Sequence, residues 1–244
     1  MATELPRPAF YALAQGGWRD YLTLLHPPYT AWHLSYVVIG AALAPELAVD
    51  RLAPTLAAFF LAVGVGAHAL DELNGRPLRT RIPAPLLVLL AALSIGGAAA
   101  IGIAGAVTVD PWLGAFVAAG VFIVCAYNLE LAGGRFHSDV WFAAAWGGFP
   151  LLTAYFAAAG EIRPEAVFAA LFASSLSLAQ RRLSTQVRDV RRRVVAVSGR
   201  IERLGGEAEP VTRETLTGAH ERALRAMALA SLALAAALLA MRLA

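Results

Sequence analysis

Apolar runs long enough to cross a lipid bilayer recur along this chain and restrict the folds it can adopt. About 20 helical residues, at 1.5 Å per residue, span a hydrocarbon core of roughly 30 Å. Seven runs approach or reach this length: 29–47, 52–71, 84–105, 111–131, 140–159, 164–182 and 222–243. The sequence therefore predicts an all-α, polytopic membrane helical bundle with about seven transmembrane helices.

Composition and small residues agree with a membrane bundle. Hydrophobic residues make up 59% of the 244 residues and charged residues only 15%, too few polar groups to cover a soluble domain. Small residues in "VIGAALA", "AVGVGA" and "AAWGG" predict close packing between helices. The third and seventh runs, rich in Ala, Leu and Ile, are predicted to face lipid.

The basic residues set the predicted orientation. All 20 are Arg, and 17 of them fall on one side if the N-terminus is cytoplasmic, leaving Arg51, Arg163 and Arg242 outside. This bias predicts a cytoplasmic N-terminus, in a bacterial or archaeal cytoplasmic membrane. The arginines are assigned to topology and lipid headgroups rather than to nucleic acid, because the basic stretches resemble no fold that reads bases.

Two segments flank the six-span bundle predicted for residues 29–182. Residues 1–28 lack a signal peptide's features and are predicted to be an interfacial amphipathic segment anchored by Trp18, Tyr21 and Leu24. Residues 183–221 are predicted to form a cytoplasmic helical hairpin before the final helix at 222–244. A heptad stripe continues span six, and a second helix starts near Thr212 after a Gly-Gly break. The stripe consists of Leu183, Val187, Val190, Val194, Val197, Ile201 and Leu204. The hairpin either packs on itself or docks another subunit.

Four stretches resemble a known family when taken together and in order. They are "LLHPPYTAWHLSYVVIGAALAP" before and in the first span, "GRPLRTRIP" after the second, "YNLELAGGRFHSDVWFAAAWGGFPLL" across the fourth and fifth, and the weaker "TQVRDVRRR" at 185–193. Over about residues 22–195 the chain resembles the UbiA superfamily of intramembrane prenyltransferases. The resemblance implies a helical bundle around a lipid-lined cavity, which transfers a polyprenyl group from a diphosphate donor to an acceptor.

The resemblance also implies site residues. Mg²⁺ held by carboxylates neutralises a diphosphate leaving group, which assigns Asp71, Glu72 and Asp189 to metal. One arginine can donate two parallel hydrogen bonds to phosphate oxygens. The resemblance therefore assigns Arg76, Arg79, Arg188 and Arg135 to the diphosphate. Tyr127 and Asn128 are further substrate-binding candidates. Asp71, Asp189 and His68 are the catalytic candidates.

The chain departs from the family pattern at these motifs. His68 and Gly75 stand where the first and last acids of the first motif would be, and Arg191, Arg192 and Arg193 replace acids after Asp189. His68 could be an acid–base residue, a hydrogen-bond donor to phosphate, a ligand for a different metal or a hydrogen-bonded interior histidine. Asp71 could instead pair with Arg76 or Arg79 at the membrane surface.

The sequence leaves two alternative functions open, one for an enzyme and one for a protein without catalysis. One is a Mg²⁺-dependent prenyltransferase acting on a polyprenyl diphosphate and a lipid-soluble acceptor. The other is a UbiA-like protein without catalysis that binds lipid or scaffolds a membrane complex. The family has nine helices and this chain seven, which predicts a homo-oligomer or a partner subunit. A transporter is disfavoured because no inverted repeat is present.

Overall fold

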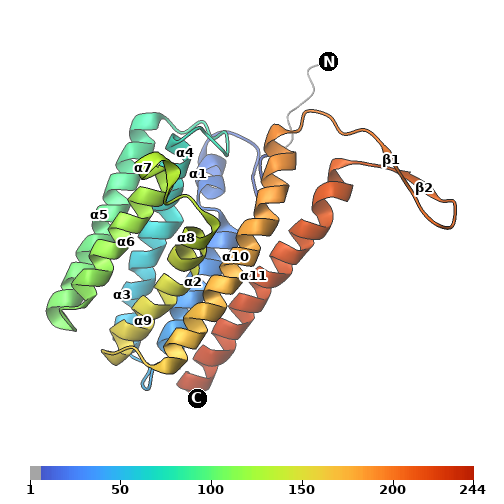
Figure 1. Ribbon diagram of the computed structural model, residues 1–244. Helices are drawn as coiled ribbons and strands as arrows, with labels where there is room; N and C mark the ends of the chain where they lie inside the picture. Colours follow the sequence, from blue (N-terminus) through green and yellow to red (C-terminus); the bar gives the residue numbers. More distant parts are fainter. Residues whose placement is uncertain (1–6) are drawn as a thin grey trace.

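A computed structural model describes residues 7–244 as a helical bundle with one short β-ribbon (Figure 1). The elements are α1 (Trp18–Leu24), α2 (Pro27–Leu43), α3 (Val49–Phe59), η1 (Phe60–Ala67), α4 (His68–Leu73), α5 (Ala84–Thr108), α6 (Leu113–Asn128), α7 (Leu131–Gly134), α8 (Asp139–Ala143), η2 (Ala144–Gly148), α9 (Phe149–Ala159), α10 (Pro164–Arg193), β1 (Arg200–Glu202), β2 (Ala208–Pro210) and α11 (Arg213–Leu243). Helix occupies each of the seven predicted spans, so the predicted all-α class is confirmed.

Four helical stretches are long and apolar enough to cross a membrane. Within residues 7–244 they are Val49–Leu73, Ala84–Thr108, Asp139–Ala159 and Arg213–Leu243. The helix α6 is apolar but shorter, and α2 has 17 residues. Long apolar helices of this kind are typical of an integral membrane protein.

The helix α2 packs at the centre of one half of the bundle, against α9, α10 and α11. Its Trp32 and Tyr36 are fully buried beside Leu151 of α9 and Leu224 of α11. The Trp32 indole N–H donates to the Tyr36 hydroxyl at 2.7 Å, so the buried indole is hydrogen-bonded. A Cβ on Gly40 would lie 2.2 Å from the Leu151 carbonyl oxygen, so only glycine permits this approach of α2 to α9.

The other half consists of η1, α4, α5 and α6, which share a separate apolar cluster. Figure 1 shows α5 and α6 on one flank and α10 and α11 on the other. The helix α5 exposes Leu93 and Val107, and α11 exposes Leu229. These faces of α5 and α11 are not covered by other parts of the described chain, as expected for helices that face lipid.

The structure differs from the predicted helical hairpin between Arg193 and Thr212. The chain leaves the helix at Val194 and forms an antiparallel ribbon in which Ile201 pairs with Glu209. Leu204, the last residue of the stripe, is fully exposed. An apolar heptad stripe stabilises a helix only where another helix covers it, and no helix among residues 7–244 packs over 195–204. β-Branched Val194, Val195 and Val197 favour the extended backbone found there.

The second helix of that segment begins where the sequence predicts. Thr212 caps α11 with a capping box, in which its hydroxyl accepts from the Thr215 N–H. The covered part of the stripe, Leu183 and Val187, packs in the same cluster as Leu224 and Met227. The ribbon connects α10 to α11 and projects away from the bundle (Figure 1).

The predicted interfacial segment is supported only in part. Residues 1–6 of the predicted 1–28 segment lie outside the described residues. Trp18 and Tyr21 of α1 are exposed, but Leu24 is buried at 2% exposure and packs in the core. Leu24 is therefore not a surface anchor, because α1 turns this side chain toward the bundle.

Candidate functional site

A polar cavity of about 410 Å³ lies at the end of the bundle that carries α1, α4 and α7. Its walls come from α2, η1 and α4, the segment from α6 to η2, and the charged end of α10. Residues 8–11 of the N-terminal segment complete the wall. Segments far apart in sequence thus meet around one space.

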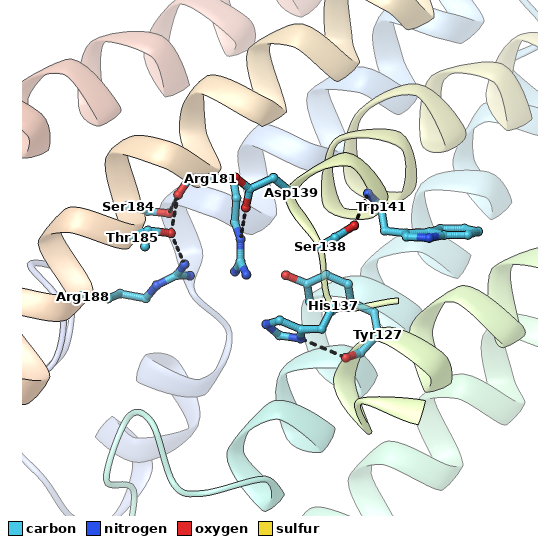
Figure 2. Close-up of polar contacts among 9 residues, drawn as sticks. All are labelled: Tyr127, His137, Ser138, Asp139, Trp141, Arg181, Ser184, Thr185 and Arg188. Carbon is cyan, nitrogen blue, oxygen red and sulfur yellow. Dashed lines mark hydrogen bonds and ion pairs between the residues drawn. The ribbon is translucent and has the colours of Figure 1, made fainter. Parts of the chain in front are cut away.

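One face of α10 makes the basic wall of the cavity. Arg181, Arg188 and Arg192 recur at spacings of seven and four, which places them on one side of a helix. Arg188 donates to the Thr185 hydroxyl at 2.9 Å, and that hydroxyl donates to the Arg181 carbonyl at 2.8 Å. Figure 2 shows Arg181 and Arg188 extending into the same space, with His137 and Tyr127 across from them.

The arginines of this wall are poorly compensated by acids. Burial lowers the pKa of Arg188, and the nearby charges of Arg181 and Arg192 lower it further, whereas Tyr127 and Asp71 act in the opposite sense. Arg181 pairs with Asp139 at 3.3 Å, but Asp139 is half exposed. Gathering like charges in a partly buried site is costly unless an anion binds there. The wall therefore has the electrostatics of an anion site.

The opposite wall carries Asp71 and His68 of α4. Asp71 lines the cavity, and its carboxylate makes no hydrogen bond or ion pair within residues 7–244. The Nδ1 atom of His68 lies 3.0 Å from the Gly64 carbonyl oxygen, and its ring contacts His26 at 3.9 Å between centroids. A carbonyl only accepts, so Nδ1 carries the proton in neutral His68, and Nε2 is left as an acceptor.

The inner end of the cavity is aromatic. Tyr127 stacks on His137 at 4.3 Å between centroids, and Phe142 stacks on Trp146 at 5.5 Å. The Trp146 carbonyl oxygen lies in the π-helical turn η2 and accepts from His33 Nδ1 at 2.9 Å. Such wide helical turns recur at functional sites, because they release a carbonyl from the regular pattern.

Two buried polar atoms at this end have no partner. Among the described residues, neither the Tyr127 hydroxyl nor the Gln180 Oε1 makes a hydrogen bond, although both side chains line the cavity. An unsatisfied buried polar group is costly and often marks a place that water or a ligand fills.

Six of the predicted site residues line this cavity, and four do not. Those that line it are His68, Asp71, Tyr127, Asn128, Arg188 and Asp189. Those that do not are Glu72, Arg76, Arg79 and Arg135. The structure thus brings these six residues together around one cavity and places the other four outside it.

Glu72 has a structural role in place of the predicted metal role. It is fully buried, and its two oxygens accept from the Leu78 N–H at 2.9 Å, the Thr80 N–H at 2.8 Å and the Thr80 hydroxyl at 2.9 Å. Arg76 donates to the Ile82 carbonyl at 2.6 Å in the same loop. Arg79 donates to the Arg192 carbonyl at 3.3 Å. These side chains fold the loop after α4 and do not line the cavity.

The carboxylates in the cavity do not fit a preformed Mg²⁺ site. Asp71, Glu130 and Asp189 line it, but no group of three His, Cys, Asp or Glu residues in the range 7–244 is arranged to hold a metal. Asp189 is 55% exposed and lies 3.8 Å from Arg193. Mg²⁺ needs several oxygen ligands at fixed positions, so the chain alone supplies too few.

Several cavity residues were not predicted from the sequence. Arg181 and Arg192 could have been found, because they continue the Arg188 face at helical spacing. His26, just before α2, stands at the basic position of the first stretch that resembles the family, whereas His33 of α2 carries no such signal. Residues 8–11 contribute because Arg192 Nε donates to the Pro8 carbonyl at 3.4 Å, and because Tyr11 packs edge-on against His26 at 5.3 Å.

Comparison with known proteins returns no match: no family model matches the chain, and neither a curated protein nor a solved structure matches it.

Proposed function

We propose that this chain is a UbiA-like integral membrane protein that binds a polyprenyl diphosphate in the polar cavity and transfers its polyprenyl group to a lipid-soluble acceptor. The observation that carries the proposal is the arginine face of α10, whose three charges are only partly compensated by acids and face an aromatic wall. A diphosphate supplies the missing anion, and an isoprenoid supplies an apolar chain for the aromatic end.

The cavity residues have complementary roles in such a transfer. Arg181, Arg188 and Arg192 donate to the phosphate oxygens, which gain charge as the carbon–oxygen bond breaks and the diphosphate leaves with the electron pair. The aromatic faces of Tyr127 and Trp146 stabilise the allylic cation and exclude water.

The acceptor must lose a proton as it bonds to the prenyl carbon. Asp71 has no partner among the described residues, and neutral His68 has a free acceptor nitrogen. Either group can take that proton in the partly buried cavity. Mg²⁺ dependence stays a prediction, and no step of this scheme requires it.

The membrane arrangement forms part of the proposal. We place α2, α6 and α10 across the bilayer beside the four longer spans, with the N-terminus and the polar cavity on the cytoplasmic side. The arginine bias supports this orientation, because the cavity end of the bundle carries the arginine-rich loops and the end of α10. A missing wall, relative to a nine-helix bundle, would be supplied by a second copy or a partner subunit.

A second candidate is a lipid-binding protein without catalysis. The observation that favours it is that Glu72 is bonded to the loop and Asp189 is largely exposed, so few carboxylates remain in the cavity to support catalysis. In that case the arginines would hold an isoprenoid phosphate without cleaving it.

One experiment separates the two functions. Purified full-length protein in detergent is mixed with farnesyl diphosphate, with and without Mg²⁺, and both equilibrium binding and diphosphate release are measured. Release that is lost in Asp71→Asn, with binding retained, supports the enzyme. Binding without release, unchanged in Asp71→Asn, supports the lipid-binding protein. Absence of binding under both conditions refutes the proposal.

A further inference from the structure

Residues 7–17 run ahead of α1 and form one side of the polar cavity. We call them the N-terminal strap. The strap precedes the stretch that resembles the UbiA superfamily, so the resemblance assigns it no role. It forms no helix or strand, yet Ala9 and Ala12 are buried, at 7% and 1% exposure. The strap is therefore packed against the bundle and takes part in its structure.

Contacts on both sides of Tyr11 hold the strap in place. The guanidinium carbon of Arg225 in α11 lies 4.7 Å from the centre of the Phe10 ring, which is a cation–π contact. On the other side of Tyr11, the Leu13 N–H donates to the Thr23 hydroxyl at 3.0 Å. The backbone around Tyr11 is thus fixed relative to both α11 and α1.

Tyr11 brings a hydroxyl group from the strap to the polar cavity. Its ring packs edge-on against His26 at 5.3 Å and against Tyr29 at 5.6 Å between centroids. All three side chains line the cavity. The Tyr11 hydroxyl makes no hydrogen bond within residues 7–244. The packing therefore positions the ring and leaves the hydroxyl without a protein partner.

This hydroxyl lies close to the arginine wall. Burial raises the pKa of Tyr11 well above its usual range, and Tyr29 raises it further. The charges of Arg192 and Arg188 act in the opposite sense, and that of Asp71 adds to the rise. Tyr11 therefore keeps its proton at neutral pH and can donate it in a hydrogen bond. Arginine side chains have no acceptor atom, so they do not provide the partner for this proton.

We infer that the Tyr11 hydroxyl donates a hydrogen bond to a phosphate oxygen of the ligand, so that the N-terminal strap supplies a binding residue to the anion site. This inference rests on the proposed function, since it assumes a diphosphate in the polar cavity. Phosphate oxygens accept from hydroxyl and guanidinium groups alike, and a donor on the strap would hold the anion from a second element besides α10. A bound phosphate would also provide the partner that the hydroxyl lacks.

Tyr11→Phe tests the inference, because it removes the hydroxyl and keeps the ring that packs on His26. Tyr21→Phe is the matched control, since Tyr21 of α1 is 40% exposed and does not line the cavity. Tyr11→Leu removes the ring as well. Binding of inorganic pyrophosphate is measured by isothermal titration for each full-length protein in detergent, together with the melting temperature of the empty protein.

We expect Tyr11→Phe to weaken pyrophosphate binding by about tenfold or more, because one hydrogen bond to a charged group is lost. The melting temperature of the empty variant should be unchanged or higher, because the substitution removes a hydroxyl that has no partner. Tyr21→Phe should match the wild type in both measurements. Tyr11→Leu should lose at least as much affinity as Tyr11→Phe.

The outcomes separate this inference from the proposed function. Wild-type affinity in Tyr11→Phe overturns the inference, and a loss confined to Tyr11→Leu does so by showing that the ring acts through packing alone. A loss in Tyr11→Phe with a lower melting temperature also overturns it, because the strap has then been displaced. No binding of pyrophosphate or farnesyl diphosphate to the wild type overturns the proposed function itself.

Discussion

Replacing Arg188 by Gln is expected to weaken diphosphate binding and to stabilise the ligand-free protein. Arg188 keeps one N–H group on the Thr185 hydroxyl and has others available for a phosphate. Hydrogen bonds to charged groups contribute about 1.5–3 kcal/mol each, so losing two costs at least about 3 kcal/mol, or roughly 150-fold or more in affinity.

The same substitution should make the ligand-free protein more stable, although it weakens ligand binding. Burial and the neighbouring arginines lower the pKa of Arg188, so its charge is less favourable in the folded protein than in the unfolded chain. This cost is full at neutral pH, where the group is charged, and it is lost only as the pH rises through the lowered pKa. Arg188→Gln removes the cost and should raise the melting temperature of the empty protein.

Isothermal titration with inorganic pyrophosphate and thermal unfolding in the same detergent measure both effects. Arg182→Gln is the matched control, since Arg182 is exposed and does not line the cavity. A variant that melts at a lower temperature and still binds pyrophosphate with wild-type affinity would refute the reasoning.

Four further outcomes are expected. Glu72→Gln should lose about 2 kcal/mol of stability, because an amide N–H group meets the loop's donors, with pyrophosphate affinity unchanged in titration. Glu221→Ala should lower the free energy of unfolding by about 3 kcal/mol, because Arg191 keeps a partly buried charge without its partner at 2.5 Å; an unchanged denaturation midpoint would contradict this. Burial and the charge of His68 lower the pKa of His26. As the pH drops below 6.5, the pKa of this group in the unfolded chain, the free energy of unfolding should therefore decrease by about 1.4 kcal/mol per pH unit. Melting curves of His26→Asn should lack this pH dependence. Replacing the mostly exposed residues 195–210 by a short Gly-Ser linker should leave the melting temperature unchanged; a large drop would show that the ribbon stabilises the bundle.

Helix positions could be predicted from the sequence because length and hydropathy determine them locally. The predicted 84–105 and 164–182 runs correspond to α5 and α10, each of which continues past the predicted end, to Thr108 and to Arg193. The ribbon could not be predicted, because a heptad stripe says nothing about whether a second helix is present to cover it. Val194 to Leu204 had no such cover and took an extended form instead.

Some residues of the candidate site could likewise be predicted from the sequence, and others could not. Asp71 and Asp189 were predicted to approach one space, and both line the cavity. Glu72 lies apart from Asp71 because neighbours on a helix point in different directions: Asp71 faces the cavity, while Glu72 faces the loop that follows. His33 of α2 could not be predicted, since hydropathy and helix length do not place α2 opposite α4.

The position of a bound diphosphate tests the central claim most directly. A structure of the protein with farnesyl thiodiphosphate, a poorly cleaved analogue, would locate the phosphorus atoms. We expect them within hydrogen-bond reach of Arg181 and Arg188, with the chain passing Trp146. Phosphorus density outside the polar cavity, or none at saturating ligand, would contradict the account.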